Sequence, residues 1–147
     1  MDSKPRRGRA GQRGQVVVEF VLASAIAFTL MFGVIDFGRA LYAYDAVASA
    51  ASVGSRYAIV HGSACTVTGC PATSATIKAY VLSQMTGVTA SSLVVTTTWS
   101  AAPGCTVSPY QGPLCLVKVE VQYPFKFVLS FGRTVTMTAY SEMIISQ

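Results

Sequence analysis

A long apolar run near the N-terminus limits what this chain can fold into more than any other feature. From Gln15 to Ile35 the sequence contains no proline and one charged residue, Glu19. Its 21 residues would extend about 31 Å as a helix, close to the thickness of a bilayer core. A buried core helix is disfavoured because the run is apolar all round and has no polar stripe. We therefore expect a transmembrane helix over residues 15–36, and we refer to residues 15–35 as the apolar segment.

A cleavable secretory signal is the main alternative to a retained anchor. Such signals have an apolar region of roughly 7–15 residues that ends in a site of small residues. The apolar segment is longer than that and leads into Asp36-Phe37-Gly38-Arg39. The small residues 23–25 (Ala-Ser-Ala) match the cleavage pattern but lie too early in the run. These features favour an anchor that is retained.

The charged residues are distributed unevenly along the chain. Of 11 Lys and Arg residues, five precede the apolar segment, at positions 4, 6, 7, 9 and 13. After residue 13 the chain carries six bases and five acids. This asymmetry predicts a single-pass protein of the cytoplasmic (inner) membrane, with a basic cytoplasmic leader over residues 1–14 and residues 37–147 outside. We expect the leader to be disordered, and no nucleic acid as a partner, because the positive charge does not persist into the folded part.

The helix should continue beyond the membrane through residues 37–61. This stretch lacks proline, is rich in alanine and ends before Gly62. One face is marked by the spacing of Phe37, Leu41, Tyr44 and Val47. A second feature is a ladder of small residues four positions apart, which either permits close packing or reflects only the helix propensity of alanine: Ala46, Ala50 and Gly54.

The rest of the chain predicts a small α+β domain. A second helix is expected over residues 74–85, where Ile77, Tyr80, Val81 and Gln84 share a face. Alternating or Val- and Thr-rich patterns then predict three strands, over residues 93–99, 114–123 and 134–140. We expect an antiparallel sheet packed against the outer half of the long helix.

Four cysteines, Cys65, Cys70, Cys105 and Cys115, all follow the apolar segment. An even number outside the membrane suits an oxidising compartment, although four reduced thiols are the alternative. Each consecutive pair brackets a loop with glycine or proline, which favours the local bridges Cys65–Cys70 and Cys105–Cys115. The spacing is poor for zinc and the chain has one histidine, so no metal site is expected.

Little in the sequence could carry catalysis. The single histidine, His61, has no partners for a triad, and no two acids outside the membrane are spaced as a general acid and base. There is no Gly-rich phosphate loop. We expect no enzyme, no catalytic residue and no cofactor.

Glu19 is the most informative polar residue. A carboxylate in an apolar span is a functional hypothesis by default, although this one is close enough to the edge to reach the interface. Gly14 closes the basic leader, and Glu19 and Phe20 are the fifth and sixth residues after it. This pattern resembles the processing site of type IV prepilins and pseudopilins. The resemblance implies that a prepilin peptidase cuts after Gly14, that the mature chain begins at Gln15, and that Glu19 pairs with the new α-amino group of a neighbouring subunit.

Residues 32–42 read FGVIDFGRALY, which resembles the FG-x-x-DFGRALY segment of TadE-like proteins. The segment V-x-V-x-Y-P at residues 119–124 also fits that family. The motif positions in this chain are Gly33, Asp36, Phe37, Gly38 and Arg39. The resemblance implies a minor pseudopilin-like component of the tight adherence (Flp-type) pilus system. Its partners would be other pilin-like subunits, the tight adherence membrane platform, the prepilin peptidase and membrane lipid. The alternative is a membrane-anchored extracytoplasmic binding module or adhesin that never enters a filament, which would not need the arrangement of Gly14, Glu19 and Phe20.

Overall fold

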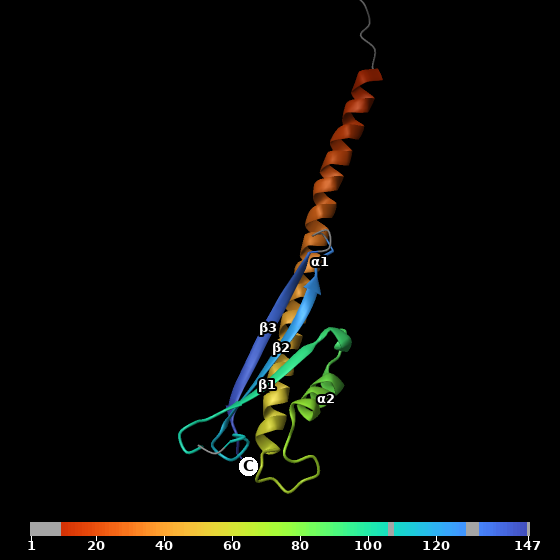
Figure 1. Cartoon of the computed structure of the whole chain (residues 1–147). Coiled ribbons are helices and arrows are strands. Elements are labelled where there is room, and N and C mark those ends of the chain that lie inside the picture. Colours follow the sequence, from red (N-terminus) through yellow and green to blue (C-terminus); the bar gives the residue numbers. More distant parts are fainter. Residues whose placement is uncertain (1–9, 106–107, 129–132, 147) are drawn as a thin grey trace, which may run out of the picture.

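The computed structural model describes residues 10–105, 108–128 and 133–146 and shows the predicted α+β fold (Figure 1). A long helix, α1 (Ala10–Val60), is followed by a short helix, α2 (Ser74–Gln84), and a single 3₁₀ turn, η1 (Ala90–Ser92). Three strands complete the described chain: β1 (Val94–Ser100), β2 (Leu116–Lys126) and β3 (Thr134–Ile144). In Figure 1 the sheet and α2 lie along the C-terminal half of α1, and the N-terminal half extends beyond them.

The start of α1 differs from the prediction. Residues 1–9 of the expected disordered leader lie outside the described residues, but residues 10–14 are helical. Ala10, Gln12 and Arg13 are good helix formers, and no proline follows Pro5 until Pro71. A helix already formed over the apolar segment therefore extends backwards at little cost.

The sheet is an antiparallel meander in the order β1-β2-β3. Strand β2 continues to Lys126, three residues past the predicted end, even though it contains Pro124. Pairing with β1 stops at Gln122, whereas pairing with β3 runs on to Lys126. Proline is tolerated where a strand has an open side, because no ladder hydrogen bond is lost there.

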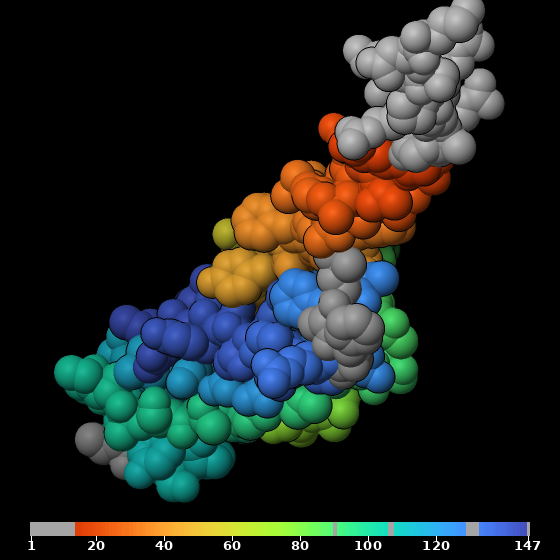
Figure 2. All heavy atoms as spheres, turned by 90° about the horizontal axis from the view of Figure 1, so that it is seen from above, coloured from red at the N-terminus to blue at the C-terminus, as the bar shows by residue number. Residues whose placement is uncertain are grey.

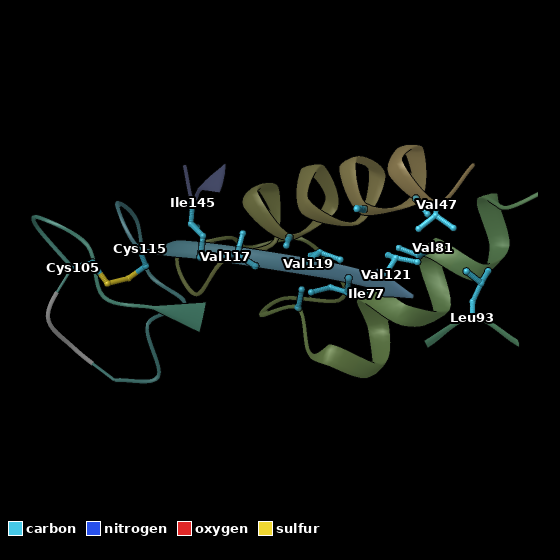
Figure 3. Close-up of a cluster of buried hydrophobic side chains, with 14 residues drawn as sticks. Val47, Ile77, Val81, Leu93, Cys105, Cys115, Val117, Val119, Val121 and Ile145 are labelled. Carbon is cyan, nitrogen blue, oxygen red and sulfur yellow. A yellow bond between two sulfur atoms is a disulfide. The ribbon is translucent and has the colours of Figure 1, made fainter. Parts of the chain in front are cut away.

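The core lies where α1 and α2 cover one face of the sheet (Figure 3). The alternation predicted for β2 is confirmed, because Val117, Val119 and Val121 are fully buried. From α2, Ile77 and Val81 are buried against the same cluster. The predicted partners of these two on α2, Tyr80 and Gln84, are exposed.

The buried face of α1 is not the one that the large residues marked. Of Phe37, Leu41, Tyr44 and Val47, only Val47 is buried, and the other three are more than half exposed. The face against the sheet consists mainly of small residues: Ala43, Val47, Ala50, Ala51, Gly54, Ser55 and Ala58. Small side chains let the helix approach the sheet closely, so the side chains of the two elements pack densely.

At Gly54 helix α1 packs very closely against both β2 and α2. A Cβ atom at this position would lie 2.9 Å from Val119 Cγ1 and 2.9 Å from Val81 Cγ2. The next residue on α1 is Ser55. Its hydroxyl donates a hydrogen bond to the Ser141 hydroxyl at 2.8 Å, and this bond joins α1 to β3. The small-residue ladder therefore serves packing and does not reflect helix propensity alone.

Two disulfides close the loops at the end of the domain farthest from the apolar segment. Cys65–Cys70 and Cys105–Cys115 are the local pairs expected from the sequence. Cys105 and Cys115 are buried in the core cluster, so their bridge also ties the β1–β2 connection to the sheet. Short closed loops of this kind stabilise by about 2–3 kcal/mol each in the chain-entropy model.

Gly54→Ala should destabilise the domain even though alanine favours a helix. The added methyl gains about 1 kcal/mol of helix propensity but clashes with two core valines, and overpacking costs about 1–3 kcal/mol. Gly38→Ala is the matched control, since a Cβ at this helical position meets nothing within 4 Å. Thermal unfolding of the full chain in detergent, followed by near-UV circular dichroism, should show a lower Tm for Gly54→Ala only. Equal Tm values for the two variants would contradict the close packing.

Candidate functional site

The N-terminal half of α1 is bare of any intrachain cover. From residue 14 to residue 35 every residue is exposed except Ser24 and Gly33, which are half-buried. Within the described residues, α1 is the one helix long and apolar enough to cross a membrane, and none of its most apolar stretch is buried. Seen from above, its red and orange atoms stand out from the body of the domain (Figure 2). An apolar surface of this size needs a membrane or a partner to cover it, which makes this half of α1 a candidate membrane anchor.

Glu19 lies on this bare part of the helix. It borders a shallow hollow on one side of the helix together with Gly14, Gln15, Val18 and Leu22. No hydrogen bond or ion pair to another described residue satisfies its carboxylate. Gly14 and Glu19 are thus on the same side of α1, where an α-amino group created at Gln15 would also lie, four residues from Glu19. Phe20 is exposed and has no contact with the domain.

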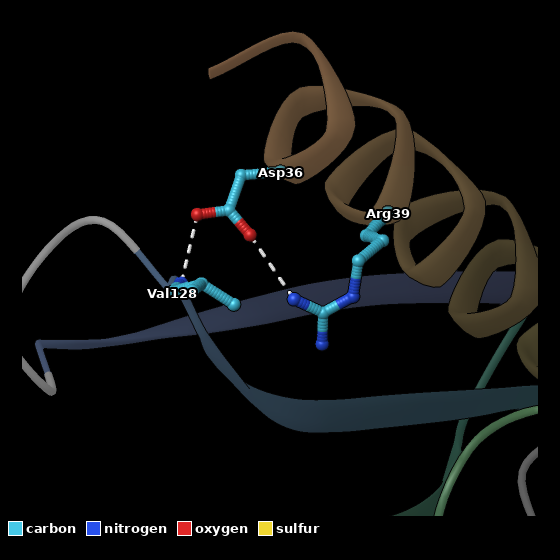
Figure 4. Close-up of polar contacts among 3 residues, drawn as sticks. All are labelled: Asp36, Arg39 and Val128. Atoms are coloured by element: carbon cyan, nitrogen blue, oxygen red, sulfur yellow. Dashed lines mark hydrogen bonds and ion pairs between the residues drawn. The ribbon is translucent and has the colours of Figure 1, made fainter. Parts of the chain in front are cut away.

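A second polar site lies where the bare half of α1 meets the domain (Figure 4). Asp36 is only 4% exposed. Its Oδ1 accepts a hydrogen bond from Arg39 Nη1 at 3.0 Å, and its Oδ2 accepts one from the backbone N–H of Val128 at 2.8 Å. The Arg39 guanidinium also lies 5.5 Å from the centre of the Phe125 ring. We call these four residues, Asp36, Arg39, Phe125 and Val128, the Asp36 junction.

The Asp36 junction holds the chain just after β2 against α1. Val128 lies two residues after the end of β2 and 92 residues after Asp36 in sequence. A hydrogen bond to a charged group contributes about 1.5–3 kcal/mol, so the Asp36–Val128 bond helps to fix where the chain after β2 lies along α1. The Arg39 side chain is 51% exposed, so its ion pair contributes much less.

The sequence motif around Asp36 divides into two parts in the structure. Asp36 and Arg39 contact the end of β2 and the chain after it, through Phe125 and Val128. Gly33 and Gly38, by contrast, have open space where a Cβ would stand, and Phe37 is 64% exposed. Nothing within the described chain requires glycine or an aromatic residue at these three positions. Their surface is available to lipid or to another helix.

A groove of about 450 Å³ opens beside the junction, between α1, the segment after α2 and the end of β2. Its walls include Arg39, Tyr42, Gly87, Tyr123 and Phe125. The Tyr42 hydroxyl donates a hydrogen bond to the Thr86 carbonyl at 3.2 Å. Gly87 has a φ of +81° and its missing Cβ leaves room for the Tyr42 ring, so this contact needs glycine for two reasons.

The other polar residues singled out in the sequence have structural contacts. His61 Nδ1 donates to the Tyr57 carbonyl at 2.9 Å, and its ring stacks on that of Tyr57 with 4.0 Å between centroids. Tyr57 stacks in turn on Tyr80 of α2. Among the residues described, no group of three or more His, Cys, Asp or Glu side chains is arranged to hold a metal ion.

The sequence did not reveal the role of Val128 and Phe125. Val128 takes part through its backbone N–H, which carries no sequence signal. The V-x-V-x-Y-P segment can be recognised in the sequence, and Phe125 follows it immediately. Its contact with Arg39, however, depends on β2 continuing past Pro124.

Together, these features define a class of protein: a small disulfide-bonded α+β domain built around the C-terminal half of an apolar helix of membrane length. Residues 14–56 match the family model described as TadE-like protein, which covers the bare helix, the Asp36 motif and most of the small-residue face. The match spans less than a third of the chain; over residues 14–56 the protein is similar to TadE-like proteins, and this likeness points to a component associated with the Tad pilus. No curated protein and no solved structure shows a significant match to the chain.

Asp36→Ala should loosen the hairpin end while leaving the core intact. Without the carboxylate, the Val128 N–H loses its acceptor, and its hydrogen exchange should accelerate by roughly 5- to 150-fold, the equivalent of about 1–3 kcal/mol. Exchange at Val119 in the core should change little. Asp45→Ala is the matched control, because Asp45 is an exposed acid on the same helix. If both variants altered Val128 exchange equally, the Asp36 bond would not be what fixes the hairpin.

Proposed function

We propose that this protein is a minor pseudopilin-like structural and assembly component of the Tad pilus system, and that it catalyses no reaction. In this proposal residues 15–36 cross the cytoplasmic membrane, the basic leader lies inside and residues 37–147 lie outside. The observation that carries it is the bare, membrane-length half of α1 with Glu19 near its end, continuous with a domain packed on the other half.

Processing after Gly14 is the first step of the proposal. Both Gly11 and Gly14 lie within the first turns of α1. Glycine in a helix is less stable than alanine by roughly 0.5–1 kcal/mol, so these turns open more readily than the Val-rich segment that follows. An open first turn would present the bond between Gly14 and Gln15 to a peptidase at the cytoplasmic edge of the membrane.

The new α-amino group at Gln15 would then need a counter-charge. Glu19 is exposed on the helix, so a neighbouring subunit's terminus can reach it when two such helices pack side by side. Pairing offsets part of the cost of holding both charges at the membrane edge, and it sets the axial register between the helices. Gly33, Gly38 and the exposed aromatic Phe37 extend the free helix surface towards the domain.

Glu19→Gln should impair assembly but not insertion, processing or folding. The amide leaves the neighbouring α-amino group without its charge partner, and breaking one side of a buried pair costs roughly 3–5 kcal/mol. Crosslinking to pilin-like subunits and piliation should both fall sharply, and Glu19→Asp should give intermediate values because the charge stays but its reach shortens. Both measurements are made in strains with the native Tad system.

Glu142→Gln is the control, because it removes an exposed carboxylate from the domain without touching the apolar segment. It should leave both measurements at the wild-type level. Wild-type crosslinking and piliation in Glu19→Gln would mean that Glu19 only extends to the interface, and would favour an anchored binding module that never enters a filament.

A further inference from the structure

Helix α1 carries a row of exposed apolar side chains beyond the apolar segment. Phe37, Leu41 and Tyr44 recur at spacings of four and three, so they share one side of the helix. They are 64%, 55% and 55% exposed, although the domain packs on another side of the same helix. We call these three residues the apolar stripe. An exposed apolar row of this kind is typical of an interaction surface.

The hydrocarbon of a membrane does not suit the apolar stripe. The sheet beside it has an open edge, because β3 is the outermost strand and pairs only with β2. Phe125, which lies against Arg39, is paired with Val135, so the start of β3 is level with the stripe. The backbone groups of an open sheet edge cannot be satisfied in hydrocarbon. The stripe therefore lies outside the bilayer core, where a protein surface can cover it.

The groove of about 450 Å³ beside the Asp36 junction lies on the opposite side of α1. The helix contributes five of its walls: Ile35, Gly38, Arg39, Tyr42 and Ala43. At about 100° per residue, these positions centre roughly 160° from the centre of the apolar stripe. The groove spans residues 35–43 of the helix and the stripe spans residues 37–44, so both lie at the same height along α1.

The walls of the groove suit apolar side chains. Beyond α1 they consist of Gly87 and three largely apolar side chains: Val88, Tyr123 and Phe125. The one charged wall residue, Arg39, is paired with Asp36 (Figure 4). An apolar occupant would therefore not bury an unpaired charge, which is the costly case.

We propose that the apolar stripe of one copy docks in this groove of a second copy beside it in the membrane. Copies anchored by the same apolar segment share one orientation and one depth, so a sideways shift alone brings the stripe of one copy level with the groove of the next. Because the two surfaces lie on opposite sides of α1, the contact is head-to-tail and each copy can bind a neighbour on either side. The inference rests on the membrane span of the proposed function, but not on processing or on Glu19.

Thiol crosslinking between two copies of the full chain tests this arrangement. The four native cysteines are paired in disulfides, so engineered cysteines supply the free thiols. One tagged copy carries Leu41→Cys in the stripe, and a second copy with a different tag carries Val88→Cys in the groove. Both are expressed in cells without a Tad system, so that no other pilus subunit is present. Membranes are treated with a short bismaleimide, and products that carry both tags are measured.

A crosslinked product with both tags is expected for Leu41→Cys with Val88→Cys. Thr98→Cys replaces Val88→Cys in the control, because Thr98 is exposed on the face of the sheet turned away from α1. This pair should give roughly fivefold less product or weaker still. Adding Tyr44→Ala to the Leu41→Cys copy should lower the yield by about fivefold or more, as truncation of an important interface residue does. Tyr140→Ala, at a similarly exposed tyrosine of β3, should leave the yield unchanged.

Three outcomes would overturn the proposal. If Leu41→Cys in one copy crosslinks to Leu41→Cys in the other but not to Val88→Cys, the copies associate stripe to stripe and the groove is not the docking site. If the yield with Val88→Cys is no higher than with Thr98→Cys, while the chain stays in the membrane after an alkaline wash, the span is correct and the copies do not dock in this way. If the alkaline wash extracts the chain, the membrane span itself is wrong, and the proposed function fails with it.

Discussion

The structure depends on α1 remaining one unbroken helix across two different environments. Its first half is apolar and bare, whereas its second half packs against a sheet through a face of small residues. A helix satisfies its backbone hydrogen bonds internally in either environment, and this is what allows a single element to be both a candidate membrane anchor and part of the core. The absence of proline between Pro5 and Pro71 is therefore the sequence property on which everything else rests.

Asp36 lies at the boundary between these two halves and links them to the sheet. It is the only acid in the described chain that is buried, and both its oxygens are occupied. The core valines fix how β2 lies against α1, but they leave the hairpin end free to splay. The bond from Asp36 to Val128 removes that freedom, and the disulfides restrain the loops at the opposite end. The domain is thus tied to its axis at both ends, with the apolar cluster between them.

Much of this could be predicted because it follows from periodicity. The length of the apolar segment, the alternation of Val117, Val119 and Val121, and the bracketed cysteine pairs all have a direct physical reading. The packing face of α1 could not be read in the same way, because Phe37, Leu41 and Tyr44 gave the stronger apolar signal. Which face packs is decided by the close approach at Gly54, and that depends on side chains contributed by α2 and β2. The C-terminal end of β2 could not be predicted either, because a strand can continue through Pro124 only where β1 no longer pairs with it.

The site residues show the same limit. Glu19 can be recognised because it is the one charged residue in the apolar segment, and Gly14 because it separates this segment from the basic leader. Val128, in contrast, acts through its backbone N–H, which no sequence pattern predicts. The outward position of Gly33, Phe37 and Gly38 adds a distinction that sequence alone does not make. It separates the motif residues that hold this fold from those that are free to face a neighbouring helix.

A pilin-like role requires, above all, that the basic leader is removed so that Gln15 carries the charge that Glu19 can pair with. The most direct measurement is the intact mass and N-terminal peptide of the protein isolated from membranes of cells with an active prepilin peptidase. We predict a mature chain that begins at Gln15, and we predict that the Gly14→Arg variant retains residues 1–14. Native protein that still carries residues 1–14 under these conditions would contradict it.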